Sequence, residues 1–73
     1  MLLLYGTDGC HLCHDAESLL KQAGLTWQMI DIVEDESLLE TYGTRIPVLK
    51  LNGLELDWPF TQEAILSLIS TSI

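Results

Sequence analysis

Residues 10–13 read Cys10-His11-Leu12-Cys13 and lie between an apolar run at 2–5 and a helical pattern at 12–23. The intervening residues 6–9, two glycines with a threonine and an aspartate, are typical of a loop. Cys10 is therefore predicted at the start of a helix, where unpaired backbone N–H groups favour an anion such as a thiolate. Cys13 follows about one turn later, within reach of a disulfide. This spacing predicts a thiol–disulfide exchange site, in which Cys10 attacks and the more buried Cys13 resolves the mixed disulfide.

The chain on either side of this stretch predicts alternating strands and helices. Apolar or β-forming residues predict strands at 2–5, 25–33, 48–51 and 54–56. Asn52-Gly53 predicts a two-residue hairpin turn, so the last two strands are expected to be antiparallel. Helices are predicted at 12–23, between the acidic residues 34–36 and Gly43, and from Phe60 onward. The predicted order is β-α-β-α-β-β-α, an α/β fold in which the first two strands are parallel.

Apolar spacing also predicts which surfaces are buried. The first strand is apolar at every position, which is expected of a strand covered on both faces. One stripe of the first predicted helix is apolar and should face the core: Leu12, Ala16, Leu19, Leu20 and Ala23. Gly24 is placed to end that helix.

Length and charge restrict the class of protein. The 73 residues predict a single domain over 1–73 with one modest core, and we expect a monomer. The formal net charge of −8 argues against nucleic acid and anionic membranes as partners. No segment has the features of a signal peptide or the length of a membrane span, so we expect a cytoplasmic protein.

The element order, with a CxxC after the first strand and Ile46-Pro47 just before the third, resembles the thioredoxin fold in its minimal, glutaredoxin-like form. The resemblance extends over essentially the whole chain, and residues 42–49 look like the segment that carries a cis-proline in thioredoxins and glutaredoxins. It implies a four-stranded mixed sheet and a cis Pro47 opposite the two cysteines. It also implies a small thiol–disulfide oxidoreductase with no cofactor beyond the Cys10–Cys13 redox pair.

Two features differ from familiar glutaredoxins. The residues between the cysteines are His11-Leu12 rather than Pro-Tyr, and the preceding loop carries Asp8 rather than a lysine. Residues 56–60 replace the glycine-rich segment that binds glutathione in the family. We therefore expect glutathione, a small anion, to be a poor ligand or reductant, because Asp8 and Asp57 would repel it. The expected substrate is a protein disulfide, presented as an extended strand to free backbone beside Pro47 and regenerated by a reductase or thiol reductant.

Five residues besides the cysteines are candidates for contact with the substrate: His11, Arg45, Ile46, Pro47 and Trp58. Arg45 either offsets acidic charge near the site, or anchors a glutathione carboxylate, or pairs with Glu40. Trp58 either contacts a partner side chain or packs against the last helix. Pro47 either faces the cysteines or begins an edge strand.

The charged neighbours of Cys10 have opposing effects on its pKa. A protonated His11 would lower the pKa of the thiol, whereas Asp8, Asp15 and Glu17 would raise it. The sequence does not decide this balance. His14 is expected to be a surface residue.

Two alternative functions stay open. Cys10, His11, Cys13 and His14 are metal-ligand types, but neighbouring residues cannot all close one tetrahedron, so a zinc site within one chain is not expected. The first alternative is therefore a zinc ion or iron–sulfur cluster shared between two chains, with Cys10 and Cys13 as ligands. The second alternative is a thioredoxin-fold interaction module without catalysis.

Overall fold

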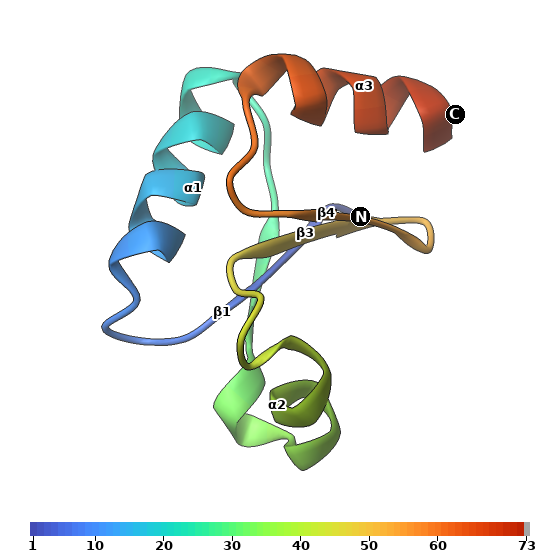
Figure 1. Ribbon diagram of the computed structural model, residues 1–73. Helices are drawn as coiled ribbons and strands as arrows, with labels where there is room; N and C mark the ends of the chain where they lie inside the picture. Colours follow the sequence, from blue (N-terminus) through green and yellow to red (C-terminus); the bar gives the residue numbers. More distant parts are fainter. Residues whose placement is uncertain (73) are drawn as a thin grey trace.

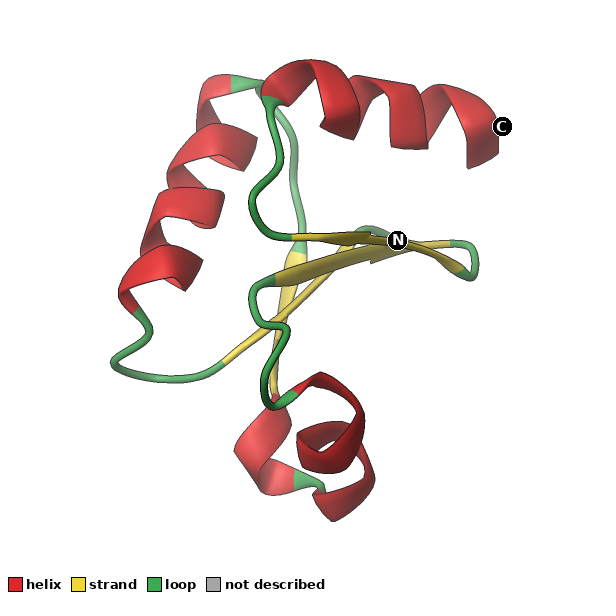
Figure 2. Ribbon diagram, in the orientation of Figure 1, coloured by secondary structure: helices red, strands yellow, loops and turns green. Residues whose placement is uncertain are grey.

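The structure is a computed structural model that describes residues 1–72. Its core is a four-stranded sheet of order β2-β1-β3-β4 (Figures 1 and 2). The strands are β1 (Leu3–Gly6), β2 (Gln28–Asp31), β3 (Val48–Leu51) and β4 (Leu54–Asp57). The helices are α1 (His11–Gln22), α2 (Glu36–Tyr42) and α3 (Gln62–Ser72), with a 3₁₀ turn η1 (Ile32–Glu34) after β2. β1 and β2 are parallel while the other two pairs are antiparallel, so the predicted mixed α/β sheet and element order are confirmed.

Both faces of the sheet are covered, as the apolar first strand predicts. Figure 1 shows α1 and α3 on one side of the strands and α2 on the other. Leu4 points into the larger cluster and Tyr5 into the smaller one, because successive side chains of a strand alternate. The larger cluster lies under α1 and α3 and comprises Leu2, Leu4, Ala16, Leu20, Leu49, Phe60, Ile65 and Leu68. The smaller lies under η1 and α2 and comprises Tyr5, Ile32, Tyr42 and Val48.

The first helix begins and ends where its capping residues predict. Cys10 is the N-cap, with extended backbone, and its sulfur accepts a hydrogen bond from the Cys13 N–H. Gly24 follows the helix with φ +73°, and its N–H donates to the Lys21 carbonyl. The predicted apolar stripe is wrong at Leu12, which is 45% exposed. Helical geometry places the buried face on Cys13, Ala16 and Leu20 instead, so Leu12 in the first turn faces solvent.

The second strand is shorter than the predicted range 25–33. Only residues 28–31 pair with β1. The Asp31 carboxylate accepts a hydrogen bond from the Val33 N–H at 3.1 Å and thereby starts η1. Such a local side-chain bond offers the backbone an alternative to the strand ladder.

The remaining elements follow their turn and cap signals. Asp35 caps α2 by accepting from the Ser37 N–H at 2.8 Å, and Gly43 lies at its end. Asn52 and Gly53 both have positive φ, at 50° and 83°, which is the backbone of a type I′ hairpin turn. The resulting register sets Val48 opposite Asp57, next to Pro47. No helix within residues 1–72 combines the length and apolar character needed to cross a membrane.

Candidate active site

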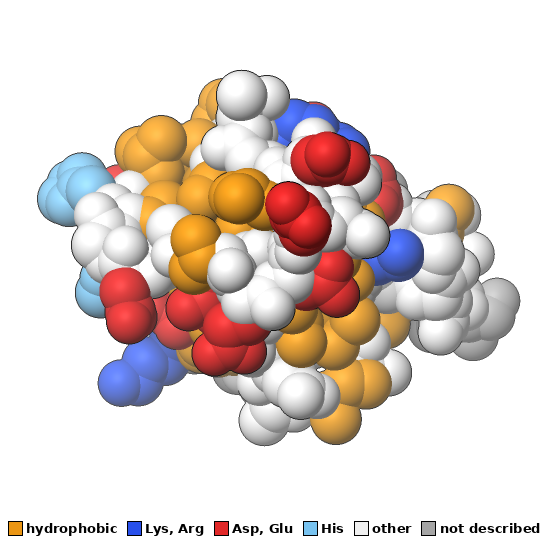
Figure 3. All heavy atoms as spheres, turned by 90° about the horizontal axis from the view of Figure 1, so that it is seen from below, with side chains coloured by type: hydrophobic (Ala, Val, Ile, Leu, Met, Phe, Trp, Pro, Cys, Tyr) orange, Lys and Arg blue, Asp and Glu red, His pale blue; other side chains and the backbone are white. Residues whose placement is uncertain are grey.

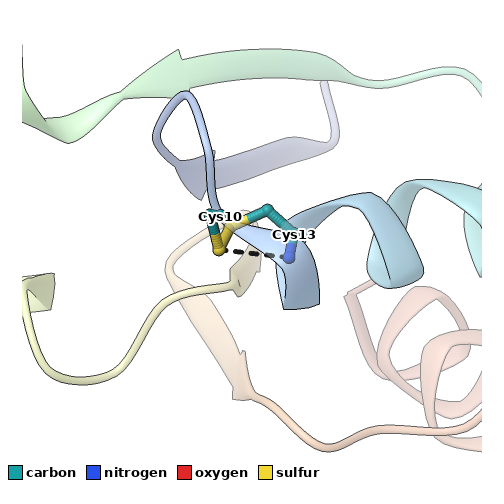
Figure 4. Close-up of a disulfide and its surroundings, with 2 residues drawn as sticks. All are labelled: Cys10 and Cys13. Atoms are coloured by element: carbon teal, nitrogen blue, oxygen red, sulfur yellow. Dashed lines mark hydrogen bonds between the residues drawn. A yellow bond between two sulfur atoms is a disulfide. The ribbon is translucent and has the colours of Figure 1, made fainter.

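Cys10 and Cys13 form a disulfide at the N-terminus of α1, with their Cα atoms 5.2 Å apart (Figure 4). The Cys13 N–H donates to the Cys10 sulfur at 3.1 Å. The two sulfurs differ in environment: Cys13 is 1% exposed, whereas Cys10 is only half-buried. A dissolved thiol or disulfide therefore reaches Cys10 more easily than Cys13. The helix terminus and the N–H bond both favour negative charge on Cys10.

Polar residues around the cysteines lie at the surface. His11 and His14 are both exposed, and so are Asp8 and Asp15. Within residues 1–72, no three side chains of the metal-binding types His, Cys, Asp and Glu converge on one point.

Pro47 lies at the same end of the sheet as the disulfide. Tyr5 of β1 pairs with Val48 of β3, and continuing this antiparallel register sets Gly6 beside Pro47. A methyl group on Gly6 would lie 2.8 Å from the Cys13 sulfur, so that sulfur packs directly on the end of β1. Pro47 is fully buried, and the Ile46–Pro47 peptide bond is cis. Ile46 is half-buried and packs against the smaller cluster.

Two backbone groups beside Pro47 are already hydrogen-bonded within the protein. The Pro47 carbonyl accepts a hydrogen bond from the Trp58 N–H at 3.1 Å. The Ile46 N–H donates to the Tyr42 carbonyl, also at 3.1 Å. These bonds arise because β4 and the end of α2 both pack next to this segment. Any substrate strand that pairs here must use other backbone groups.

Arg45 pairs with β4 and not with Glu40, which excludes one of the three alternatives given for this residue. Its guanidinium donates two hydrogen bonds to the Asp57 carboxylate, at 3.0 and 2.8 Å, and one to Glu55 at 2.8 Å. Residues 55 and 57 are two positions apart in β4, so their side chains lie on the same face of the sheet. The side chain of Arg45 is 33% exposed, so solvent screens this pairing in part.

Two tyrosines extend the Arg45 contacts into the smaller cluster. The Tyr42 hydroxyl donates to Glu55 at 2.5 Å, and its ring stacks on Tyr5 with centroids 4.4 Å apart. The Arg45 guanidinium lies 5.1 Å from the centre of the Tyr42 ring. The roles of Glu55 and Tyr42 were not predicted, although Glu55 and Asp57, two residues apart after the hairpin turn, were an available signal.

These contacts shift the ionisation of the groups involved. The hydrogen bond to Glu55 and burial raise the pKa of Tyr42 to about 12. The bonds from Tyr42 and then Arg45 lower the pKa of Glu55. The Arg45 guanidinium lowers the pKa of Asp57. At neutral pH the Asp57 carboxylate is therefore charged and paired.

Trp58 packs within the protein. It is half-buried, contacts the larger cluster and meets Phe60 edge-on, with ring centroids 5.1 Å apart. This packing matches the second alternative for Trp58, since Phe60 lies two residues before α3. A separate groove of about 330 Å³ lies between β4 and α3, and the two cysteines are not among the residues that line it.

Comparison with known proteins agrees with this fold. The family model described as a glutaredoxin-like domain (DUF836) matches residues 1–70. The X-ray structure of target protein XcR50 from X. campestris is 37% identical, covers 100% of both chains and has a TM-score of 0.90. The solution structure of protein Ne2328 from Nitrosomonas europaea is 32% identical over 90% of this chain and 86% of its own, with a TM-score of 0.70.

A more distant structure shares the fold alone. The glutaredoxin of Archaeoglobus fulgidus is 22% identical over 93% of this chain and 84% of its own, with a TM-score of 0.67. No curated protein sequence matches the chain significantly. The thioredoxin-type fold, the CxxC pair in disulfide distance and the family match lead to one conclusion: this chain belongs to the glutaredoxin-like domain family.

Proposed function

We propose that the protein is a thiol–disulfide oxidoreductase in which Cys10 is the nucleophile and Cys13 the resolving thiol. The observation that carries this proposal is the unequal environment of two bonded sulfurs. Cys10 is half-buried at a helix N-cap and its sulfur accepts a hydrogen bond from the Cys13 N–H, whereas Cys13 is 1% exposed. An attacking thiol must be accessible and ionised, while a resolving thiol needs only to reach its neighbour.

The reaction follows from these positions. In the reduced protein the Cys10 thiolate attacks one sulfur of a substrate disulfide, which forms a Cys10–substrate disulfide and releases the other substrate sulfur as a thiolate. The Cys13 thiolate then attacks the Cys10 sulfur and releases the second substrate thiol. Two electrons pass to the substrate, and the Cys10–Cys13 disulfide forms. A reductase or a thiol reductant returns the protein to the dithiol by the reverse chemistry.

The proposed substrate is a protein disulfide, and the proposed setting is the cytoplasm, with the protein acting as a monomer. Glutathione is proposed to be a weaker reductant. The carboxylate expected to repel glutathione is Asp8, because Asp57 is paired with Arg45 and presents no isolated negative charge. The same pairing occupies Arg45, the cation that would otherwise anchor a glutathione carboxylate.

Trapping with single-cysteine variants tests the roles of the two sulfurs. Cys13→Ala, reduced and then mixed with a cystine-bridged peptide, is expected to hold the peptide in a nearly stoichiometric mixed disulfide, visible by mass spectrometry. Cys10→Ala is expected to hold none, because its remaining sulfur is buried. Cys10→Ala/Cys13→Ala is the background control. Equal trapping by the two single variants would contradict the assignment.

The same preparation tests the metal-binding alternative. Metal analysis and the visible absorption spectrum of anaerobically purified protein report a zinc ion or an iron–sulfur cluster shared by two chains. A bound cluster that disappears in either cysteine variant would replace the redox proposal by a binding function.

A further inference from the structure

We propose that Gly6 is a positioning residue for the resolving sulfur of Cys13. Gly6 is the last residue of β1 and is buried. A methyl group placed on it would lie 2.8 Å from the Cys13 sulfur and 3.3 Å from the Cys13 Cβ. It would also lie 3.2 Å from the terminal methyl of Met29 on the neighbouring strand. A Cβ atom essentially never lies within 3.0 Å of a neighbouring heavy atom, so the space above Gly6 holds the sulfur because no side chain is present there.

The need for glycine here is one of space and not of backbone conformation. Positive φ occurs at Gly9, Gly24 and Gly53, and Gly6 is not among these residues. Alanine at position 6 would therefore fit the backbone and disturb only what touches its methyl group. Gly6→Ala therefore probes the contacts above Gly6, of which the Cys13 sulfur is the closest.

The contact bears on the second chemical step. Cys13 must direct its sulfur at Cys10 to displace a bound substrate, and close packing on β1 restricts where that sulfur lies. Met29, which is 39% exposed, brings its methyl group to the same spot from β2. The resolving role assigned to Cys13 rests on the function proposed above, whereas the packing of its sulfur on Gly6 does not.

A double-mutant cycle separates these points. In the oxidised protein, Gly6→Ala is expected to lower the folding equilibrium constant about tenfold, the equivalent of about 1.4 kcal/mol. In the Cys13→Ala background the sulfur is gone and only the longer contacts to the Cβ atom and to Met29 remain, so the same change should cost less than in the oxidised protein. Urea unfolding measures both. Gly24→Ala is the matched control, because its positive φ predicts the same loss in both backgrounds.

Each outcome of the cycle decides the proposal. Equal losses from Gly6→Ala in the two backgrounds would overturn it. If oxidised Gly6→Ala does not fold, recovery of folding in Gly6→Ala/Cys13→Ala supports the proposal, and failure to recover contradicts it. If the single-cysteine variants trap the peptide as expected but the two substitutions have additive effects on stability, only the inference about Gly6 is refuted. A coupled cycle beside failed trapping would refute only the redox roles.

A kinetic measurement then tests the link to catalysis. With a cystine-bridged peptide in a single turnover, Gly6→Ala is expected to release the first peptide thiol at the normal rate. Release of the second thiol, which needs Cys13, should slow about tenfold. Gly24→Ala should change neither rate at temperatures where it is folded. Slowing of the first step alone would contradict a positioning role toward Cys13.

Discussion

At the scale of single residues, the two cysteines differ by position in the same helical turn. Cys10 is the N-cap and lies just outside the helix, whereas Cys13 lies on the buried face of α1 and is 1% exposed. The sequence predicted this difference, because Cys13 lies one turn inside the helix. It did not predict that Gly6 makes room for the Cys13 sulfur. That contact depends on how α1 sits above β1, which no local pattern encodes.

The position of Cys10 predicts a thiol that is more acidic than free cysteine, with a pKa below about 8.5. The Cys13 N–H and the helix terminus stabilise the thiolate. The pH dependence of iodoacetamide alkylation, measured on reduced Cys13→Ala, reports this pKa. Asp8→Asn should lower this pKa further, because a nearby carboxylate opposes ionisation of the thiol. Lys21→Gln, which is distant, should leave it unchanged. A midpoint at or above 8.5 would contradict the proposed role of Cys10 as the ionised nucleophile.

At the scale of elements, Arg45 joins the loop before Pro47 to strand β4. The hairpin itself was predictable, since Asn52-Gly53 is a strong local signal. The partner of Arg45 was not, because Glu40 is close in sequence while Asp57 becomes close only through the β3–β4 register. The same register brings the Trp58 N–H to the Pro47 carbonyl. The sequence therefore predicts the segment next to the cysteines but not the contacts that its backbone and side chains already make.

The paired carboxylates predict an acid-sensitive contribution to stability. The pKa values of Asp57 and Glu55 are lowered in the folded protein, so their contribution is complete above the ordinary values of 3.8 and 4.5. It is lost as the pH falls through the lower folded values. Arg45→Gln should be less stable than wild type at pH 6, and the difference should shrink toward pH 2. Urea midpoints across this range measure it.

The control for this prediction is Lys21→Gln, which removes one positive charge from the exposed face of α1. Its effect on stability should not follow the same pH dependence. A gap between wild type and Arg45→Gln that persists unchanged at pH 2 would show that the carboxylates are not the source.

At the scale of the whole molecule, few cations lie near the disulfide. Lys21 is eleven residues beyond Cys10, about 16 Å along α1. Lys50 pairs with Leu3, at the end of β1 away from Gly6. Arg45 is engaged by Glu55 and Asp57. Figure 3 shows acidic side chains grouped on the face seen from below, on the side of α2. The net charge of −8 follows directly from the sequence, whereas the distances between the charged groups and the disulfide depend on the fold.

This distribution predicts how reduction of the oxidised protein depends on salt. Glutathione is a net anion, so acidic surroundings slow its approach, and salt screens that repulsion: the Debye length is about 30 Å at 0.01 M and about 3 Å at 1 M. Reduction by glutathione should therefore speed up several-fold over this range of added salt. Cysteamine, whose ammonium group offsets the thiolate charge, is the matched reductant and should not speed up. Stopped-flow tryptophan fluorescence, with Trp58 near Pro47, offers a direct signal for both reactions. A rate with glutathione that falls as salt is added would mean attraction, and would restore glutathione as a favoured reductant.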